Sequence, residues 1–164
     1  MHRRIWQTLW FLLILTYAVV GLAETQAEKL DRMYQKLLPK FQQAIEINMD
    51  QLSEQEIIFV DVRANEEQAV SVIPGAITMD AFVKAPERYR SSKLVAYCTI
   101  GYRSGRFAIK WQAKGYDVKN LKGGVLAWAQ AGKLFQTPSG IETKRVHVYD
   151  DDWNFLPEDY IAIW

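Results

Sequence analysis

The chain has a single cysteine, Cys98, and the residues that follow it are suited to holding a sulfur anion. Gly101 can adopt the positive φ angle that most residues resist, which lets a short loop fold inward. The backbone N–H groups of such a loop, at the start of a helix, form a site for negative charge. Arg103 and, one helical turn later, Arg106 add positive charge. These surroundings favour the thiolate form of Cys98, which is the nucleophilic form.

Composition removes several other uses of the thiol. The 164 residues include one cysteine and two histidines, His2 and His147, which excludes an internal disulfide and a Cys/His zinc site. Neither histidine is near the loop in sequence, which argues against a cysteine–histidine protease. A lone cysteine at the end of a strand is most often an inert small hydrophobe. The glycine and arginines after Cys98 favour a reactive thiol instead.

The segments around this loop alternate between strand and helix patterns. Short apolar runs typical of buried parallel strands occur at residues 57–60, 76–79, 94–97 and 118–121. Helices are predicted between and after them, at residues 65–70, 103–114 and 125–131. This alternation indicates an α/β domain with a mainly parallel sheet. Because Cys98 directly follows one of the strands, we expect it at the carboxyl edge of the sheet, where α/β folds place their sites.

The first 23 residues have the pattern of an export signal. Arg3 and Arg4 precede a long apolar stretch, and small residues lead up to Ala23. This order is typical of a secretory signal peptide that is cleaved after Ala23. The alternative is an uncleaved membrane anchor over residues 5–23, which is near the lower length limit for spanning. Both alternatives place the remaining chain outside the cytoplasm, in the periplasm or secreted.

Two further segments flank the predicted central domain, which covers residues 46–135. Residues 24–45 contain a predicted helix at 25–38, with apolar residues at spacings of three and four. Residues 136–164 form a tail whose aromatic residues we expect to pack onto the domain. Three consecutive aspartates at 150–152 fit a solvated turn, because the alternating oxygen ligands and glycine of a calcium loop are missing.

Three segments, in order, resemble the rhodanese family. Residues 98–104, Cys-Thr-Ile-Gly-Tyr-Arg-Ser, resemble its active loop C-x-x-G-x-R-S. Residues 61–76 resemble its DVR…EE…IPGA segment, and residues 115–128 resemble its GY-x-V…LxGG-x-x-AW segment. The resemblance covers approximately residues 46–135. It departs from the family pattern at Ser71-Val72, where Gly-His is frequent, and at Gln68, where an aromatic residue is common.

The resemblance implies a fold and a reaction. The fold is a mainly parallel five-stranded sheet flanked by helices. In the reaction, the Cys98 thiolate takes the outer sulfur of a donor such as thiosulfate, and an acceptor such as cyanide or another thiol removes it from the resulting persulfide. The residues expected to hold the persulfide are Thr99, Ile100, Gly101, Tyr102 and Arg103. Arg103 would also attract the anionic donor, Asp61 and Arg63 would support the loop, and the Gly123-Gly124 turn would serve packing.

Loop length and charge narrow the expected ligands. Four residues separate Cys98 from Arg103, and the phosphatase relatives of the family use one more, so sulfur chemistry is favoured over phosphate chemistry. A formal net charge of +1 offers no basic surplus for nucleic acid. We expect no metal and no cofactor besides the covalent persulfide on Cys98. The expected partners are small sulfur compounds or a thiol protein, with a membrane only if residues 5–23 are retained.

Two other functions fit the same residues. A binding or sensing module could keep the fold without turnover, with the altered Ser71-Val72 segment and the aromatic tail covering the site. A redox role through a mixed disulfide is the third alternative. It would need a thiol from another molecule, because the chain has no second cysteine.

Overall fold

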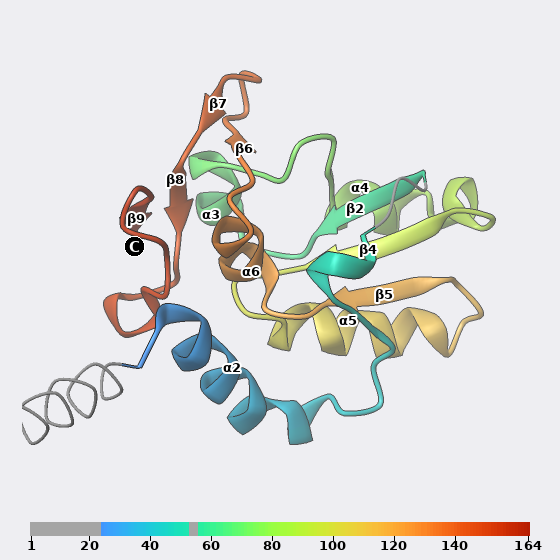
Figure 1. Cartoon of the computed structure of the whole chain (residues 1–164). Coiled ribbons are helices and arrows are strands. Elements are labelled where there is room, and N and C mark those ends of the chain that lie inside the picture. The colour runs from blue at the N-terminus through green and yellow to red at the C-terminus, as the bar shows by residue number, and fades with distance from the viewer. Residues whose placement is uncertain (1–23, 53–55) are drawn as a thin grey trace, which may run out of the picture.

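The computed structural model describes residues 24–52 and 56–164 (Figure 1). Residues 1–23, which carry the predicted signal peptide or anchor, lie outside the described residues. The expected location outside the cytoplasm therefore stays a prediction. Within the described ranges, no helix combines the length and the apolar character that crossing a membrane requires.

A parallel sheet forms the centre of the molecule. Its strands are β1 (Glu46–Ile47), β2 (Ile57–Asp61), β3 (Ile77–Thr78), β4 (Lys93–Tyr97) and β5 (Val118–Leu121). They lie in the order β1-β5-β4-β2-β3, and every neighbouring pair is parallel. The predicted α/β class with a five-stranded parallel sheet is confirmed. The two-residue strand β1 has no separate signal in the sequence.

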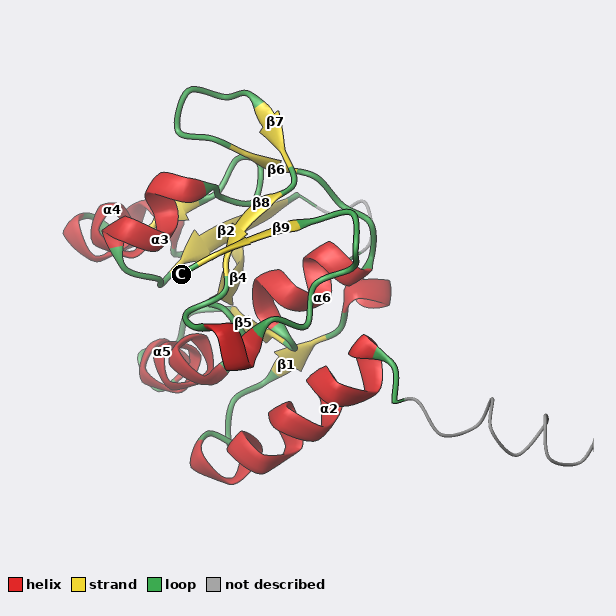
Figure 2. Ribbon diagram, turned by 90° about the vertical axis from the view of Figure 1, so that its left-hand side faces the viewer, coloured by secondary structure: helices red, strands yellow, loops and turns green. Residues whose placement is uncertain are grey.

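Helices cover both faces of this sheet. They are α2 (Gln26–Leu37), α3 (Asn65–Val70), α4 (Met79–Lys84), α5 (Tyr102–Gln112) and α6 (Gly124–Gln130), with 3-10 turns η1 (Leu38–Lys40), η2 (Met49–Gln51), η3 (Pro86–Tyr89) and η4 (Asp151–Trp153). Figure 2 shows α4 and α5 on one side of the sheet and α6 on the other. Helix α4 differs from the sequence expectation of a run through Met79. The Thr78 hydroxyl accepts the Ala81 N–H at 3.1 Å, and this cap ends the strand and starts a helix.

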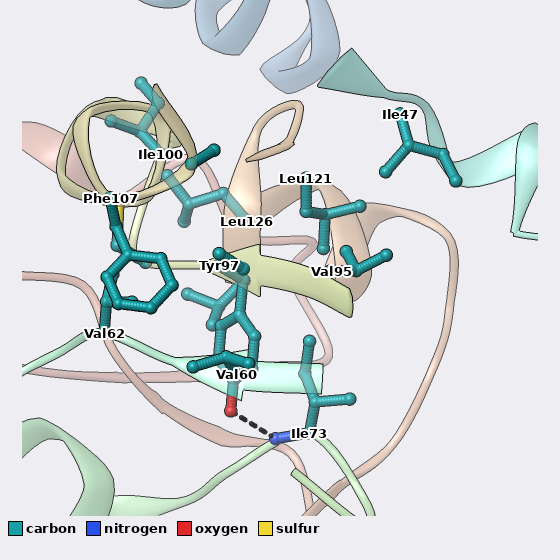
Figure 3. Close-up of a cluster of buried hydrophobic side chains, with 14 of the residues drawn as sticks. Ile47, Val60, Val62, Ile73, Val95, Tyr97, Ile100, Phe107, Leu121 and Leu126 are labelled. Atoms are coloured by element: carbon teal, nitrogen blue, oxygen red, sulfur yellow. Dashed lines mark hydrogen bonds between the residues drawn. The ribbon is translucent and has the colours of Figure 1, made fainter. Parts of the chain in front are cut away.

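The core explains the unbroken apolar sequence of β4. Helices lie on both sides of this central strand, so all of its side chains after Lys93 are buried. Figure 3 shows Val95 and Tyr97 of β4 among side chains from the neighbouring strands, such as Val60 and Leu121. Such packing fixes the end of β4, and with it the position at which the reactive loop begins.

The tail returns to the domain as two small pairings. Strand β6 (Phe135–Gln136) pairs antiparallel with β7 (Glu142–Thr143), and β8 (Arg145–His147) pairs parallel with β9 (Ile161–Ile163). Val146, Val148, Leu156 and Tyr160 are buried, so the tail packs onto the domain. The expectation for its aromatic residues is confirmed only in part, because Tyr160 is buried whereas Tyr149 and Trp164 are exposed. Figure 1 shows β8 running past α3.

The tail is attached where the sequence departs from the family pattern. The buried Ser71 hydroxyl donates a hydrogen bond to the Arg145 carbonyl at 2.6 Å. Val72 exchanges backbone hydrogen bonds with Gln136, at 2.8 and 2.9 Å. Ser71 and Val72 therefore connect the central domain to the tail at two points, Arg145 and Gln136.

Candidate active site

Cys98 lies directly after β4, at the carboxyl edge of the sheet. Its side chain is 1% exposed, and it forms part of the wall of a cavity. The Gly101 N–H donates to its Sγ atom at 3.1 Å, and the Ser104 hydroxyl oxygen lies 3.5 Å from the same atom. Gly101 caps α5 and Ser104 lies in its first turn, so the strand–loop–helix order inferred from the sequence places a backbone donor and a polar hydroxyl beside the sulfur.

The tight turn at Gly101 brings its amide to the sulfur. Gly101 has φ +116° and caps the N-terminus of α5. A Cβ atom at this position would lie 2.7 Å from Cε2 of Tyr34, so both the backbone angle and the available space require glycine. Helix α2, which carries Tyr34, thus packs directly on the back of the loop.

Helix α6 holds the other side of the loop. The Val125 N–H donates to the Cys98 carbonyl at 2.9 Å, and the Leu126 N–H donates to the Thr99 carbonyl at 3.3 Å. A Cβ atom on Gly124 would lie 2.1 Å from the Cys98 carbonyl oxygen. Gly124 therefore allows the start of α6 to approach the loop backbone, which is a more specific role than the packing expected of this turn.

Arg103 is held by an ion pair with Glu67 of α3. Its Nη1 and Nη2 atoms donate to the two carboxylate oxygens at 2.5 and 2.7 Å. The Thr99 hydroxyl joins them, accepting from Arg103 at 3.1 Å and donating to Glu67 at 3.1 Å. The Ala64 N–H adds a fourth hydrogen bond to the same carboxylate. Arg103 is therefore fixed in one orientation, and its charge is paired.

The pKa shifts of this pair follow from burial and pairing. Burial favours the neutral form of Glu67, but hydrogen bonds from Arg103 and the Ala64 N–H outweigh it and lower the pKa of Glu67 below its ordinary value. Burial acts against the charged form of Arg103 too, and Glu67 and the Cys98 sulfur outweigh it, so the pKa of Arg103 is raised. Both side chains are charged at neutral pH.

Asp61 and Arg63 form a separate buried cluster behind the loop. The Arg63 guanidinium donates to the Asp61 carboxylate and to the Ser71 carbonyl, each at 2.6 Å from Nη2. The Tyr97 hydroxyl donates to Asp61 at 2.7 Å. It accepts the Ile73 N–H at 3.1 Å, as Figure 3 shows. Because Tyr97 immediately precedes Cys98, this cluster fixes the end of β4 and does not contact the sulfur.

A second hydrogen-bond network lies on the α2 side of the sulfur. The Ser104 hydroxyl, beside Cys98, donates to the Asn120 side chain at 2.7 Å. Asn120 donates in turn to the Tyr34 hydroxyl at 3.2 Å and to Glu46 at 3.4 Å. Burial raises the pKa of Glu46, and the hydrogen bond from Asn120 opposes this shift. The network links β1, β5 and α2 to the serine that contacts the sulfur.

The cavity above Cys98 has a volume of about 290 Å³ and is mainly apolar. Its lining residues are Leu37, Cys98, Thr99, Ile100, Tyr102, Arg103, Tyr149 and Trp153. Every residue expected to hold the persulfide therefore borders the cavity, except Gly101, whose amide donates to the sulfur without lining the cavity. Arg106 lies on the exposed side of α5, where it donates to the Tyr102 hydroxyl at 3.3 Å.

Comparison with known proteins places this architecture in a family. A model of the Rhodanese-like domain matches residues 45–131, more than half of the chain. The chain belongs to the rhodanese-like family. A protein of Allochromatium vinosum named "Sulfurtransferase" is 31% identical over 104 residues, which cover 58% of this chain and 97% of that protein. This relative supports a rhodanese-type enzyme of the sulfurtransferase family.

A solved structure shares this fold. A protein from Bacillus halodurans has a TM-score of 0.51 at 22% identity, covering 67% of this chain and 88% of that one. A rhodanese-like domain protein from Staphylococcus aureus is 28% identical, with a TM-score of 0.49 and coverage of 57% and 97%. The family match leaves α2 and the whole tail outside it.

Several site residues have weak signals in the sequence. Glu67 belongs to the quoted family segment, but only the fold shows that its carboxylate pairs with Arg103. Leu37, Tyr149 and Trp153 border the cavity from segments far from the loop in sequence. Their aromatic and apolar character was apparent, whereas their place beside the sulfur depends on how the flanking segments fold back.

Proposed function

We propose that this rhodanese-like protein transfers a sulfane sulfur through a persulfide on Cys98. The observation that supports this most directly is the position of Sγ, which borders the cavity, accepts the Gly101 N–H at 3.1 Å and lies 3.5 Å from the Ser104 hydroxyl oxygen. Donors placed in this way stabilise negative charge on sulfur, before and after the transfer. No cofactor is needed for either step.

The first step charges the cysteine. The Cys98 thiolate attacks the outer sulfur of thiosulfate, and the sulfur–sulfur bond of thiosulfate breaks. Sulfite leaves with the electron pair, and the outer sulfur stays on Cys98 as a persulfide anion. The Gly101 N–H and the remaining loop amides would hold that anion.

The second step restores the thiolate. A nucleophile such as cyanide attacks the outer persulfide sulfur, the bond to Cys98 Sγ breaks, and thiocyanate leaves. A thiol of a small molecule or of a partner protein can act in the same way and become the persulfide itself. Cys98 is regenerated without net oxidation or reduction of the protein.

Intact-mass spectrometry after incubation with thiosulfate tests the proposal. We expect the mass to rise by one sulfur atom in the wild type, to return after cyanide is added, and to stay unchanged in Cys98→Ser. Absence of the adduct in the wild type, with thiosulfate and with organic sulfane-sulfur donors alike, would refute the persulfide intermediate. An adduct that neither cyanide nor a thiol removes would favour the sensing module over the enzyme.

The sensing alternative gains support from the tail, because Tyr149 and Trp153 border the cavity. Deletion of the tail is a poor test, since it would remove the buried side chains of Val146 and Val148 from the core. Repeated release of thiocyanate by the intact chain separates the two functions directly. A module without turnover would release at most one equivalent.

A further inference from the structure

The outer walls of the cavity come from outside the region that matches the family. Leu37 is the last residue of α2, and Tyr149 and Trp153 belong to the tail, whereas the family match covers residues 45–131. The sulfur itself and the loop lie within the match. The reactive loop is therefore part of the domain that the family shares, whereas the outer walls of the cavity come from segments outside that domain.

Tyr149 is held in an unusual backbone conformation at this wall. Its φ is +79°, which is strained for a bulky residue that is not glycine. Its N–H donates to Nδ1 of His147 at 3.1 Å, and its ring lies 5.7 Å from the ring of Trp153. Strain of this kind persists only where neighbouring contacts maintain it. The contacts here keep the Tyr149 ring near the cavity, although the residue is 59% exposed.

The charges around the cavity do not favour a small dianion. Arg103 is the one charged side chain among the described lining residues, and Glu67 neutralises it. Its guanidinium also lies 5.9 Å from the Tyr149 ring centre. Exposed Lys40 and Arg106 approach the Tyr102 ring, at 5.7 and 5.9 Å from its centre, whereas exposed Asp151 and Asp152 lie between Tyr149 and Trp153 in the chain. A mainly apolar interior whose one charged side chain is already paired, with charges of both signs outside it, suits an organic group better than a small dianion.

We infer that the cavity selects an organic sulfane-sulfur donor with an apolar, ring-sized group, such as an aromatic thiosulfonate anion. This inference rests on the proposed persulfide function and names its substrate class. The volume of about 290 Å³ lies near the lower end of small-molecule sites, which run from roughly 300 to 1,000 Å³. The ring of the donor would pack against Tyr149, Trp153 and Leu37, with its sulfur directed at Cys98.

The transfer step is balanced without another reactant. The Cys98 thiolate attacks the terminal sulfur of the thiosulfonate, and the bond between that sulfur and the sulfonyl sulfur breaks. The organic sulfinate leaves with the electron pair, and Cys98 becomes the same persulfide anion that thiosulfate would give. Thiosulfate and thiosulfonates thus differ in the group that the outer walls must accommodate.

A comparison of three donors tests the inference, with cyanide as the acceptor and the intact chain as the enzyme. We expect kcat/KM for benzenethiosulfonate to exceed that for methanethiosulfonate by about tenfold, the value of one favourable aromatic contact. Tyr149→Ala and Trp153→Ala should each lower this ratio several-fold, and Trp153→Phe should retain most of it. Trp164→Ala is the matched control, because Trp164 is a tail aromatic that is 63% exposed and does not border the cavity.

The outcomes separate the two proposals. Equal kcat/KM values for both thiosulfonates in the wild type, unchanged in the alanine variants, would overturn the inference and leave the persulfide function intact. A kcat/KM for thiosulfate above that for both organic donors would also overturn it. Failure of all three donors to add sulfur to Cys98, measured by intact mass, would refute the persulfide function on which the inference depends.

Discussion

Glu67→Gln tests whether the ion pair with Arg103 holds the reactive loop in place. The Glu67 carboxylate accepts hydrogen bonds from Arg103, Thr99 and the Ala64 N–H, and its side chain is 5% exposed. Glutamine keeps the shape and one acceptor oxygen, but it removes the charge and turns N–H donors toward the donors of its neighbours. The variant therefore removes a charged interaction without creating a cavity.

The expected loss of stability follows from how much of the pair is buried. Removing one member of a fully buried pair costs about 3–5 kcal/mol, and an exposed pair contributes about 1 kcal/mol or less. The Arg103 side chain is 34% exposed, so water can solvate part of its charge in the variant. We therefore expect the free energy of unfolding to fall by about 2 kcal/mol at pH 7. This corresponds to a decrease of about 4–8 °C in Tm for a chain of this size.

The pKa of Glu67 determines in which direction this loss of stability changes with pH. The pKa of Glu67 is lower in the folded protein than its ordinary value of about 4.3, so its contribution is complete above that value. The contribution is lost as the pH falls through the folded pKa. Urea unfolding at pH 7, 5 and 4 should show a difference between wild type and variant that shrinks on acidification.

Glu66→Gln is the matched control for this experiment. Glu66 precedes Glu67 in the same helix and is exposed, so its substitution changes the net charge equally and should alter stability by less than about 0.5 kcal/mol. The reasoning is refuted if Glu67→Gln behaves like Glu66→Gln at pH 7. It is equally refuted if the deficit of Glu67→Gln stays constant between pH 7 and pH 4.

Two further substitutions test the support of the loop. Gly101→Ala should slow persulfide formation more than tenfold and lower stability by about 1–2 kcal/mol, because it combines a positive φ with a Cβ 2.7 Å from Tyr34; an unchanged time course by intact mass would contradict this. Tyr97→Phe should lower the free energy of unfolding by about 1–3 kcal/mol in urea titration, because it leaves the buried Ile73 N–H without its acceptor and removes one of the hydrogen bonds to Asp61. A loss below about 0.5 kcal/mol would show that this cluster does not support β4.

The central part of the fold was predictable because its signals are local. The apolar runs of β2, β4 and β5 are the pattern that burial on both faces of a sheet requires. The loop after Tyr97 is indicated by a glycine and an arginine within a few residues of each other. Strand β1 was not predictable in the same way. Its two residues, Glu46 and Ile47, become a strand only because β5 lies beside them.

Contacts between distant segments account for most of what the sequence did not reveal. Arg103 was expected to attract an anionic donor, yet Glu67, 36 residues away in the chain, pairs with it. Arg106 was expected to add charge at the loop, and it lies on the outside of α5. A charged residue can be placed near a site from sequence, but the partner that determines its net effect depends on the packing of another helix.

The reactive loop itself leaves little room for change in selectivity. Gly101 is packed against Tyr34 on one side, and Gly124 is packed against the Cys98 carbonyl on the other, so added side-chain atoms at either glycine would disturb the sulfur. Selectivity is more easily altered in segments that border the cavity without shaping the loop. The tail is such a segment, and its attachment at Ser71 coincides with a departure from the family pattern. Substitutions at Tyr149 and Trp153, the tail residues that line the cavity, should therefore change which donor is preferred while the environment of the sulfur is preserved.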